Sequence, residues 1–166
     1  MDQDYIMRMV VQVNTFICRK MRLVTTNKKA LKTICKNYSV ALAYLFGSQA
    51  EEGLKLLNGE NVRPVDSMAD LDLAIVFNKN LPPSNQLPGF YADLYNQLAD
   101  IFLPYSLDLV FLQEQHSVFQ AQVVTGICIY AENETFKGDY EEDVMRRAAD
   151  FKPFLEKFFE ERLERL

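Results

Sequence analysis

The chain has 166 residues, of which 49% are hydrophobic and 25% are charged, and its formal net charge is −5. This composition is typical of one globular domain and excludes wholesale disorder. The acidic balance argues against a binder of duplex nucleic acid, because such a surface is basic. It leaves open a small polyanion such as a nucleotide, whose charge a metal ion can neutralise locally.

The three cysteines favour free, buried thiols in a reducing compartment, because they match neither a metal-ligand spacing nor a disulfide framework. They are Cys18, Cys35 and Cys128. The N-terminal segment has acids before its first base and no small-residue cleavage site, so it is a poor signal peptide. No run reaches the ~18 apolar residues of a membrane span. We therefore expect a cytoplasmic protein without a membrane partner.

Helical spacing of apolar residues predicts an amphipathic helix over 5–23 and a second, shorter helix over 28–37. The pattern of apolar residues then changes. A continuous apolar run, Val40–Phe46, is stopped by Gly47, which is typical of a strand buried on both faces. Residues 49–69 are polar and carry Gly, Asn and Pro, so they predict a loop or a loop with a short helical piece.

The rest of the chain alternates predicted strands and helices. In order, these are a strand over 71–77, an irregular segment over 78–89, a helix over 90–102, a strand over 106–112, a short helix over 117–124, a strand over 126–130 and an amphipathic helix over 140–166. Pro153 is expected to kink or restart the last helix. This order predicts an α/β (α+β) domain with a small mixed β-sheet of about four strands flanked by helices.

Three acidic residues stand in or beside apolar strands. Because side chains alternate along a strand, Asp70 and Asp72 share a face, with Cα atoms roughly 6–7 Å apart. Both can therefore reach one divalent cation. Asp108 lies inside the apolar sequence SLDLVFL, where a lone carboxylate is costly unless it is paired or bound to a metal. Oxygen ligands without histidine suit Mg²⁺ better than zinc.

Each acid taken singly also has an ordinary structural explanation. An Asp-x-Asp pair is common where a loop enters a strand, and Asp70 could cap a turn. Only the joint occurrence of Asp72 and Asp108 in separate apolar strands favours a metal site. The single histidine, His116, lies in a polar segment and is interpreted as a surface residue. That interpretation excludes a Ser-His-Asp triad and a histidine-based zinc site.

Gly47 and Ser48 follow the first strand directly. A glycine there lets the backbone approach a ligand closely, and the hydroxyl of the next residue adds a donor. Backbone amides at such a turn form a binding site for anions. A Gly-Ser pair alone carries almost no information, so its value lies in its position between a buried strand and the Asp-x-Asp strand.

The segments LAYLFGSQA, SMADLDLAIVF and SLDLVFL together resemble the nucleotidyltransferase fold of the DNA polymerase beta superfamily, in its minimal, MntA-like branch. The resemblance covers roughly residues 30–160 and implies the polymerase-beta-like fold. It also implies that Gly47 and Ser48 hold a nucleoside triphosphate. Asp70, Asp72 and Asp108 would be the catalytic and metal-binding residues, with Mg²⁺ (two ions) as cofactor and ATP as substrate.

The same resemblance implies an Mg-dependent transfer of AMP from ATP to a protein hydroxyl, as the antitoxin of a HEPN/MNT toxin–antitoxin pair. The expected partner is a HEPN-type toxin, and a homo-oligomer is left open. We expect one nucleotidyltransferase domain over 1–166, with N-terminal helices over 1–37, a catalytic core over 38–135 and a C-terminal helix over 137–166. Little chain then remains to enclose a small acceptor in a cavity of about 300–1,000 Å³.

Two departures from the family pattern stand beside this resemblance. Twenty-one residues separate Ser48 from Asp70, which is longer than is usual in the minimal branch, and Gln49 stands where many relatives carry an arginine. The alternatives are a small-molecule (aminoglycoside-type) nucleotidyltransferase and a catalytically silent nucleotide-binding module that acts by occluding its partner.

Overall fold

Four strands form one mixed sheet at the centre of the computed structural model, which describes residues 27–64, 66 and 69–163. They are β1 (Val40–Phe46), β2 (Asp70–Phe77), β3 (Ser106–Phe111) and β4 (Ile127–Ala131), in the spatial order β3-β2-β1-β4. β1 runs antiparallel to both of its neighbours, whereas β2 and β3 are parallel. The predicted fold class, a four-stranded mixed sheet flanked by helices, is confirmed. The helix predicted over 5–23 lies outside the described residues, as does Cys18.

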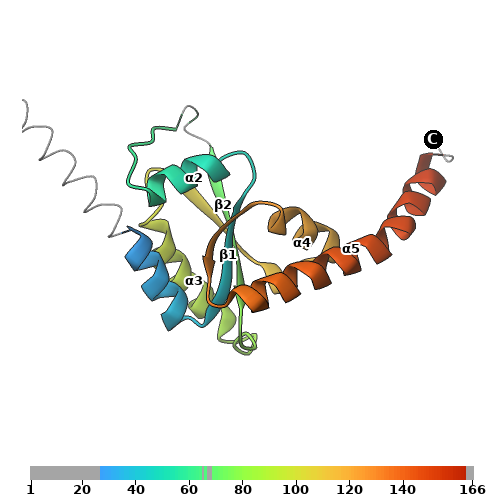
Figure 1. The fold of residues 1–166 in the computed structure, drawn as a ribbon, viewed down its shortest axis with the longest axis horizontal. Helices are drawn as coiled ribbons and strands as arrows, with labels where there is room; N and C mark the ends of the chain where they lie inside the picture. The colour runs from blue at the N-terminus through green and yellow to red at the C-terminus, as the bar shows by residue number, and fades with distance from the viewer. Residues whose placement is uncertain (1–26, 65, 67–68, 164–166) are drawn as a thin grey trace, which may run out of the picture.

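Helices cover both faces of the sheet (Figure 1). They are the helix of residues 27–37, α2 (Ala50–Leu57), α3 (Leu87–Ala99), α4 (Ser117–Val124) and α5 (Glu134–Leu163), with a 3₁₀ turn, η1 (Leu112–Glu114), after β3. The first three lie on one face, and α4 and α5 lie on the other (Figure 1). Among the described residues, no helix combines the length and apolarity that crossing a membrane requires.

Two cores follow from the alternation of side chains along the strands. In β2, Leu73 and Ile75 point to the face covered by α2 and α3, and they belong to the larger core. Ala74 and Val76 point to the other face and pack in a smaller core with α4 and with Val144 of α5. Both faces of the middle of β2 are therefore buried, which accounts for the continuous apolar sequence.

Several element boundaries differ from the sequence prediction, and three of the starts have a clear physical reason. α3 begins at Leu87 rather than at residue 90, because proline is tolerated in the first helical turn, where its missing N–H leaves no bond unmade. β4 begins one residue later than predicted because Gly126 is in the turn, where its N–H donates to the Val123 carbonyl. α5 begins at Glu134 because the Asn133 side chain accepts the N–H groups of residues 135 and 136.

α5 is held to the sheet by its N-terminal half. The hydroxyl of Tyr44, fully buried in β1, donates a 2.9 Å hydrogen bond to Glu141. Farther along, the helix continues through Pro153 rather than restarting, and it bends in its C-terminal portion (Figure 1). Phe154 is 69% exposed there. The helix therefore changes from a packed element to one that projects from the body of the domain.

Candidate active site

The sheet register brings the predicted aspartates to one end of the sheet. β2 and β3 are parallel and in register, so Asp72 lies directly opposite Asp108 and Asp70 lies opposite Ser106. Neighbouring strands are about 5 Å apart. Although 35 residues stand between Asp72 and Asp108 in the chain, they are thus immediate neighbours in space.

These carboxylates lie on the face of the sheet that α4 and α5 cover only in part. Because side chains alternate along a strand, Asp72 points to the same face of the sheet as Ala74 and Val76, and Asp108 points to the same face as Val110. Ala74 and Val76 are buried beneath the helices, but Asp72 is only half-buried and Asp70 and Asp108 are exposed. The acidic residues therefore stand just beyond the edge of the smaller core, where solvent and ligands have access.

Burial and like charges raise the pKa of Asp72. Partial burial is the main cause, and the neighbouring charges of Asp108 and Asp70 add to it in that order. Each of these effects disfavours the ionised carboxylate, because it is removed from water and faces negative charge. A cation placed among the three groups would relieve this cost, so the electrostatics favour a positively charged ligand here.

The turn after β1 closes on the same carboxylate. Phe46, the last residue of β1, is opposite Asp72 in the antiparallel pairing, and Gly47 follows it with φ +71°. A Cβ built at Gly47 would collide with the Asp72 carboxylate and lie 3.0 Å from its Cγ. Glycine is therefore required twice over, by the left-handed backbone and by the close approach of Asp72.

Ser48 and Gln49 complete this turn, which leads into α2. Ser48 is exposed, and its Oγ accepts a 3.2 Å hydrogen bond from Gln49 Nε2. The first turn of α2 contains Glu51 and Glu52. Two acids in the first turn repel an anion from the N-terminus of α2, so the helix itself is a poor phosphate site. A phosphate at Gly47 and Ser48 therefore needs a cation on the aspartate side.

The donor set fits a hard divalent cation such as Mg²⁺. Carboxylate oxygens are the ligands that Mg²⁺ prefers, and Asp72 and Asp108 are side by side on rigid strands. In the part of the chain that the structure describes, no three acidic, cysteine or histidine side chains already enclose a metal position. The strands thus fix the backbone positions, while the exposed side chains of Asp70 and Asp108 are free to turn toward an ion.

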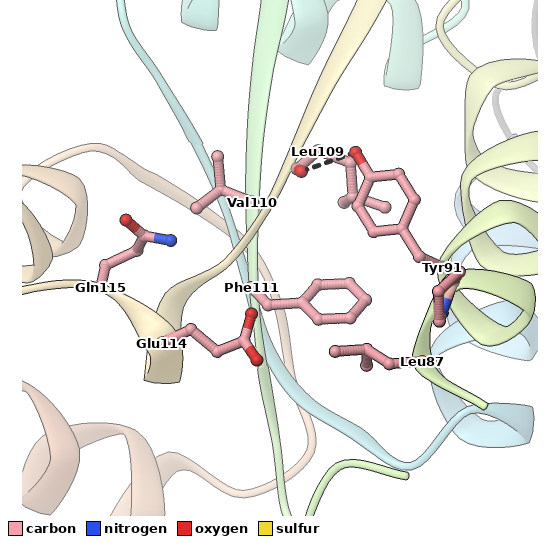
Figure 2. A pocket seen from close by; sticks show the side chains of 8 residues that line it. Leu87, Tyr91, Leu109, Val110, Phe111, Glu114 and Gln115 are labelled. Atoms are coloured by element: carbon pink, nitrogen blue, oxygen red, sulfur yellow. Dashed lines mark hydrogen bonds between the residues drawn. The ribbon is translucent and has the colours of Figure 1, made fainter. Parts of the chain in front are cut away.

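An open pocket lies along the outer edge of β3, beside residues that follow Asp108 in the chain (Figure 2). Its volume is about 440 Å³, and it is lined by Leu87, Pro88, Tyr91, Leu109, Val110, Phe111, Glu114 and Gln115. The sequence-based expectation was that little chain remains to enclose a small acceptor, and this pocket is open to solvent. The sequence alone does not reveal that β3 is an edge strand, beside which α3 and η1 leave a hollow.

Tyr91 joins the pocket to the aspartates. Its hydroxyl donates a 2.9 Å hydrogen bond to the Leu109 carbonyl, and Leu109 is the residue after Asp108 (Figure 2). The pKa of Tyr91 is raised, first by burial and then by the negative charge of Asp108. Sequence reasoning missed this residue, because a tyrosine on a helix looks like an ordinary core aromatic.

The remaining side chains singled out in the sequence have structural roles. His116 is exposed and caps α4, its Nδ1 accepting a 3.3 Å hydrogen bond from the Val118 N–H. Cys35 is buried and Cys128 is half-buried, and both are free thiols. Burial raises the pKa of Cys35 to about 12, so it is not a nucleophile near neutral pH.

Comparisons with known proteins agree on the fold. The family model described as "Polymerase beta, Nucleotidyltransferase" matches residues 29–135. A search of curated protein sequences gave no significant match. Among solved structures, a chain of the MntA–HepT toxin–antitoxin complex is 16% identical, with a TM-score of 0.57, and the match covers 84% of this chain and 98% of that one.

Two further structures are similar to the same extent. One is a tri-AMPylated Shewanella oneidensis HEPN toxin in complex with MNT antitoxin, with a TM-score of 0.58, 17% identity and coverage of 84% of this chain and 98% of that chain. The other, a toxin–antitoxin with AMP-PNP, gives a TM-score of 0.51, 20% identity and coverage of 80% and 98%. At these identities the likeness establishes a common fold.

Proposed function

Because the chain belongs to the polymerase beta nucleotidyltransferase family, and is thus a nucleotidyltransferase, we propose that it transfers AMP from ATP to a hydroxyl of a partner protein. Asp70, Asp72 and Asp108 are the catalytic residues and bind Mg²⁺ (two ions), and Gly47 and Ser48 bind the triphosphate. One observation carries this proposal above the others. The Asp72–Asp108 pair lies side by side on parallel strands, with Gly47 packed against Asp72.

The residues divide the work of an in-line displacement. The acceptor oxygen attacks the α-phosphorus of ATP, and the bond from that phosphorus to the bridging oxygen of pyrophosphate breaks. Asp108, the outermost acid, accepts the proton of the attacking hydroxyl and passes it to water. The backbone at Gly47 and the hydroxyl of Ser48 orient the departing pyrophosphate. When bound, Mg²⁺ supplies positive charge against the charge that develops on the attacking and leaving oxygens.

A HEPN-type toxin is the proposed acceptor, and the chain is its MNT antitoxin. The relatives in two of the similar structures are named as antitoxins or as MntA in toxin complexes, and the toxin in one of them is AMPylated. The net charge of −5 complements a basic partner such as an RNA-cleaving protein. The projecting part of α5, with Phe154 exposed, supplies apolar surface for such a contact.

A small-molecule acceptor remains the second candidate, and the pocket beside β3 is the observation that favours it. Its volume of about 440 Å³ lies within the range of small-molecule sites. Against it, the pocket is open, and only Glu114 among its lining residues carries a charge. A polycationic acceptor such as an aminoglycoside needs several carboxylates, so we favour the protein acceptor.

Radiolabelled ATP tests the proposal directly. The full chain is incubated with α-³²P-ATP, MgCl₂ and a HEPN-type toxin protein, and the mixture is resolved by denaturing electrophoresis and mass spectrometry. We expect the partner to gain one or more AMP units. Label on an added aminoglycoside alone would overturn the protein acceptor, and no label on either would support the catalytically silent module.

Ligand-induced stabilisation gives an independent measurement. ATP with Mg²⁺ or Mn²⁺ is expected to raise the thermal midpoint, and either component alone is expected to do less. A ligand at a hundredfold excess over its Kd adds about 2.7 kcal/mol of stability. A chain that transfers no AMP yet shows this shift would bind nucleotide without catalysis.

A further inference from the structure

An aromatic side chain stands in line with the acids on one face of the sheet. Phe46 of β1 pairs directly with Asp72 of β2, which pairs directly with Asp108 of β3. Residues that pair directly point to the same face, so the ring of Phe46 and the two carboxylates share the face that α4 covers in part. Because neighbouring strands are about 5 Å apart, Phe46 stands one strand spacing from Asp72.

Phe119 of α4 completes an aromatic pair with Phe46. The two rings meet edge to face, with their centroids 5.6 Å apart and an angle of 87° between their planes. The turn after α4 fixes this arrangement, because a Cβ built at Gly126 would collide with the Leu45 carbonyl and lie 3.3 Å from the Phe46 Cβ. The glycine thus lets the end of α4 lie directly against the last residues of β1. Phe119 is held in place over Phe46 as a result.

The Phe46–Phe119 pair keeps aromatic surface in contact with solvent. Both residues are half-buried at the edge of the smaller core. Tyr44, two residues earlier in β1 and on the same face, is fully buried, and its hydroxyl donates to Glu141. The core on this face is therefore closed at Tyr44 and open at the Phe46–Phe119 pair, beside the acids. A flat ligand that covers exposed aromatic surface is stabilised by both burial and ring contact.

The geometry of the proposed reaction leaves the base of the nucleotide on this side. An in-line displacement places the attacking oxygen and the leaving pyrophosphate on one line through the α-phosphorus. The ribose and base are attached off that line. The rings of the pocket beside β3, Tyr91 and Phe111, belong to the larger core on the opposite face of the sheet. A base whose α-phosphate lies at Asp72 and Asp108 therefore meets the Phe46–Phe119 pair instead.

We propose that Phe119, backed by Phe46, stacks on the base of the nucleoside triphosphate and that the stacked area makes the chain prefer purine to pyrimidine nucleotides. This inference rests on the proposed function and adds how the base is selected. The two rings carry no hydrogen-bonding group, so they respond to the area of a base rather than to its donors and acceptors. A purine covers more of a ring face than a pyrimidine does. ATP and GTP therefore bind alike, and CTP binds about fivefold more weakly.

Fluorescence tests the stacking directly, because the chain has no tryptophan. Phe119→Trp gives the full chain a single indole at the proposed position. We expect ATP with MgCl₂ to quench its emission saturably, whereas inorganic tripolyphosphate with MgCl₂, which has no base, should leave it unchanged. The matched control is Phe136→Trp on α5, where the residue is 38% exposed and stacks on Tyr140. We expect no saturable quenching in that variant.

Calorimetry measures how much the ring contributes to binding. Phe119→Leu keeps the apolar bulk of the side chain and removes the ring. We expect its Kd for ATP in MgCl₂ to rise about fivefold, and we expect the difference between ATP and CTP to disappear. Phe119→Tyr, which keeps a ring, should restore both properties. Phe136→Leu, the same change on α5, should bind as the wild type does.

Two results would overturn the inference. If Phe119→Leu binds ATP as the wild type does and the indole of Phe119→Trp is not quenched, the base lies elsewhere. If GTP binds as weakly as CTP, the base is recognised by hydrogen bonds rather than by its area. Neither measurement needs an acceptor, so both decide the inference even if the chain transfers no AMP. Conversely, AMP transfer by the wild-type chain would leave the proposed function intact after either result.

Discussion

The two ends of β2 belong to one strand but have opposite environments. From Leu73 to Phe77 every side chain is 4% exposed or less, because helices cover both faces of the sheet. At the other end, Asp70 is exposed and Asp72 is half-buried, because the second helical layer stops short of them. The comparison shows that the candidate site occupies the part of the sheet where one of the two layers ends.

This arrangement separates the residues that stabilise the fold from those that bind ligands. The covered end of β2 supplies apolar burial, which contributes about 25 cal/mol for each Å² removed from water. At the open end, partial burial and then the negative charges of Asp108 and Asp70 raise the pKa of Asp72. Substitutions at the two ends should therefore have opposite consequences for activity and stability.

The largest expected effect is on catalysis at the open end. Asp72→Asn should lower the rate of AMP transfer by about 10²–10³-fold, because it removes one preorganised charge from the site. The control is Asp93→Asn, which makes the same change at an exposed position of α3. Circular dichroism checks that both variants are folded, and near-normal transfer by folded Asp72→Asn would show that Asp72 binds no metal.

The next largest effect is on stability at the covered end. Leu73→Ala should lower the free energy of unfolding by about 2–5 kcal/mol, because it leaves a cavity in the larger core. Asp70→Ala, on the same strand but exposed, should change it by no more than about 0.5 kcal/mol. Urea denaturation measures both, and equal losses would mean that the two ends of β2 do not differ as described.

A third variant acts at the junction of the two ends. Gly47→Ala should cost about 1–3 kcal/mol, since it places a Cβ at positive φ, and it should also displace Asp72 and reduce AMP transfer. Gly138→Ala is the control, because a Cβ in α5 at that position meets nothing within 4 Å and a helical alanine is favourable. If the two variants were equally stable and active, the close approach of Gly47 to Asp72 would have no functional role.

The smallest expected effect is the pH dependence of stability without metal. Because the pKa of Asp72 is raised above 3.8 in the folded chain, the folded state holds its proton longer than the unfolded state does. Stability therefore falls as pH rises above 3.8, and the full penalty remains at neutral pH. With EDTA present, Asp72→Asn should melt up to about 3 °C higher than wild type at pH 7.

The same comparison at pH 3 serves as the control, since the Asp72 carboxyl is then largely protonated in both the folded and the unfolded chain. The two proteins should melt at the same temperature there. A mutant that melts lower than wild type at pH 7 in EDTA would contradict the repulsion among the three aspartates.

The strands and their acids could be predicted from the sequence, because each strand is an apolar run in which a charged residue stands out. β1 was predicted at Val40–Phe46 and is found there. The pairing of Asp72 with Asp108 could not be predicted, since register depends on how β2 and β3 align across the intervening helix. That the acids meet was predicted from the cost of carboxylates in apolar strands, which a shared cation relieves, and from the resemblance to a known family, but neither argument gives the register.

The pocket was beyond the reach of sequence reasoning for a related reason. Whether β3 is a central or an edge strand is decided by the whole topology, and its sequence, SLDLVF, looks like that of any buried strand. Tyr91 likewise has the spacing of a core residue of α3. Only the structure reveals that its hydroxyl binds the Leu109 carbonyl at the outer edge.

The in-register pairing of β2 and β3 has a consequence for how the chain folds. Slipping β3 by one residue would turn Asp108 into the larger core and turn Leu107 and Leu109 out to water. A buried, unpaired carboxylate costs several kcal/mol, so the slipped sheet is strongly disfavoured. The Asp108 carboxylate, which repels its neighbours in the native site, therefore also disfavours a misfolded sheet in which β3 is shifted by one residue.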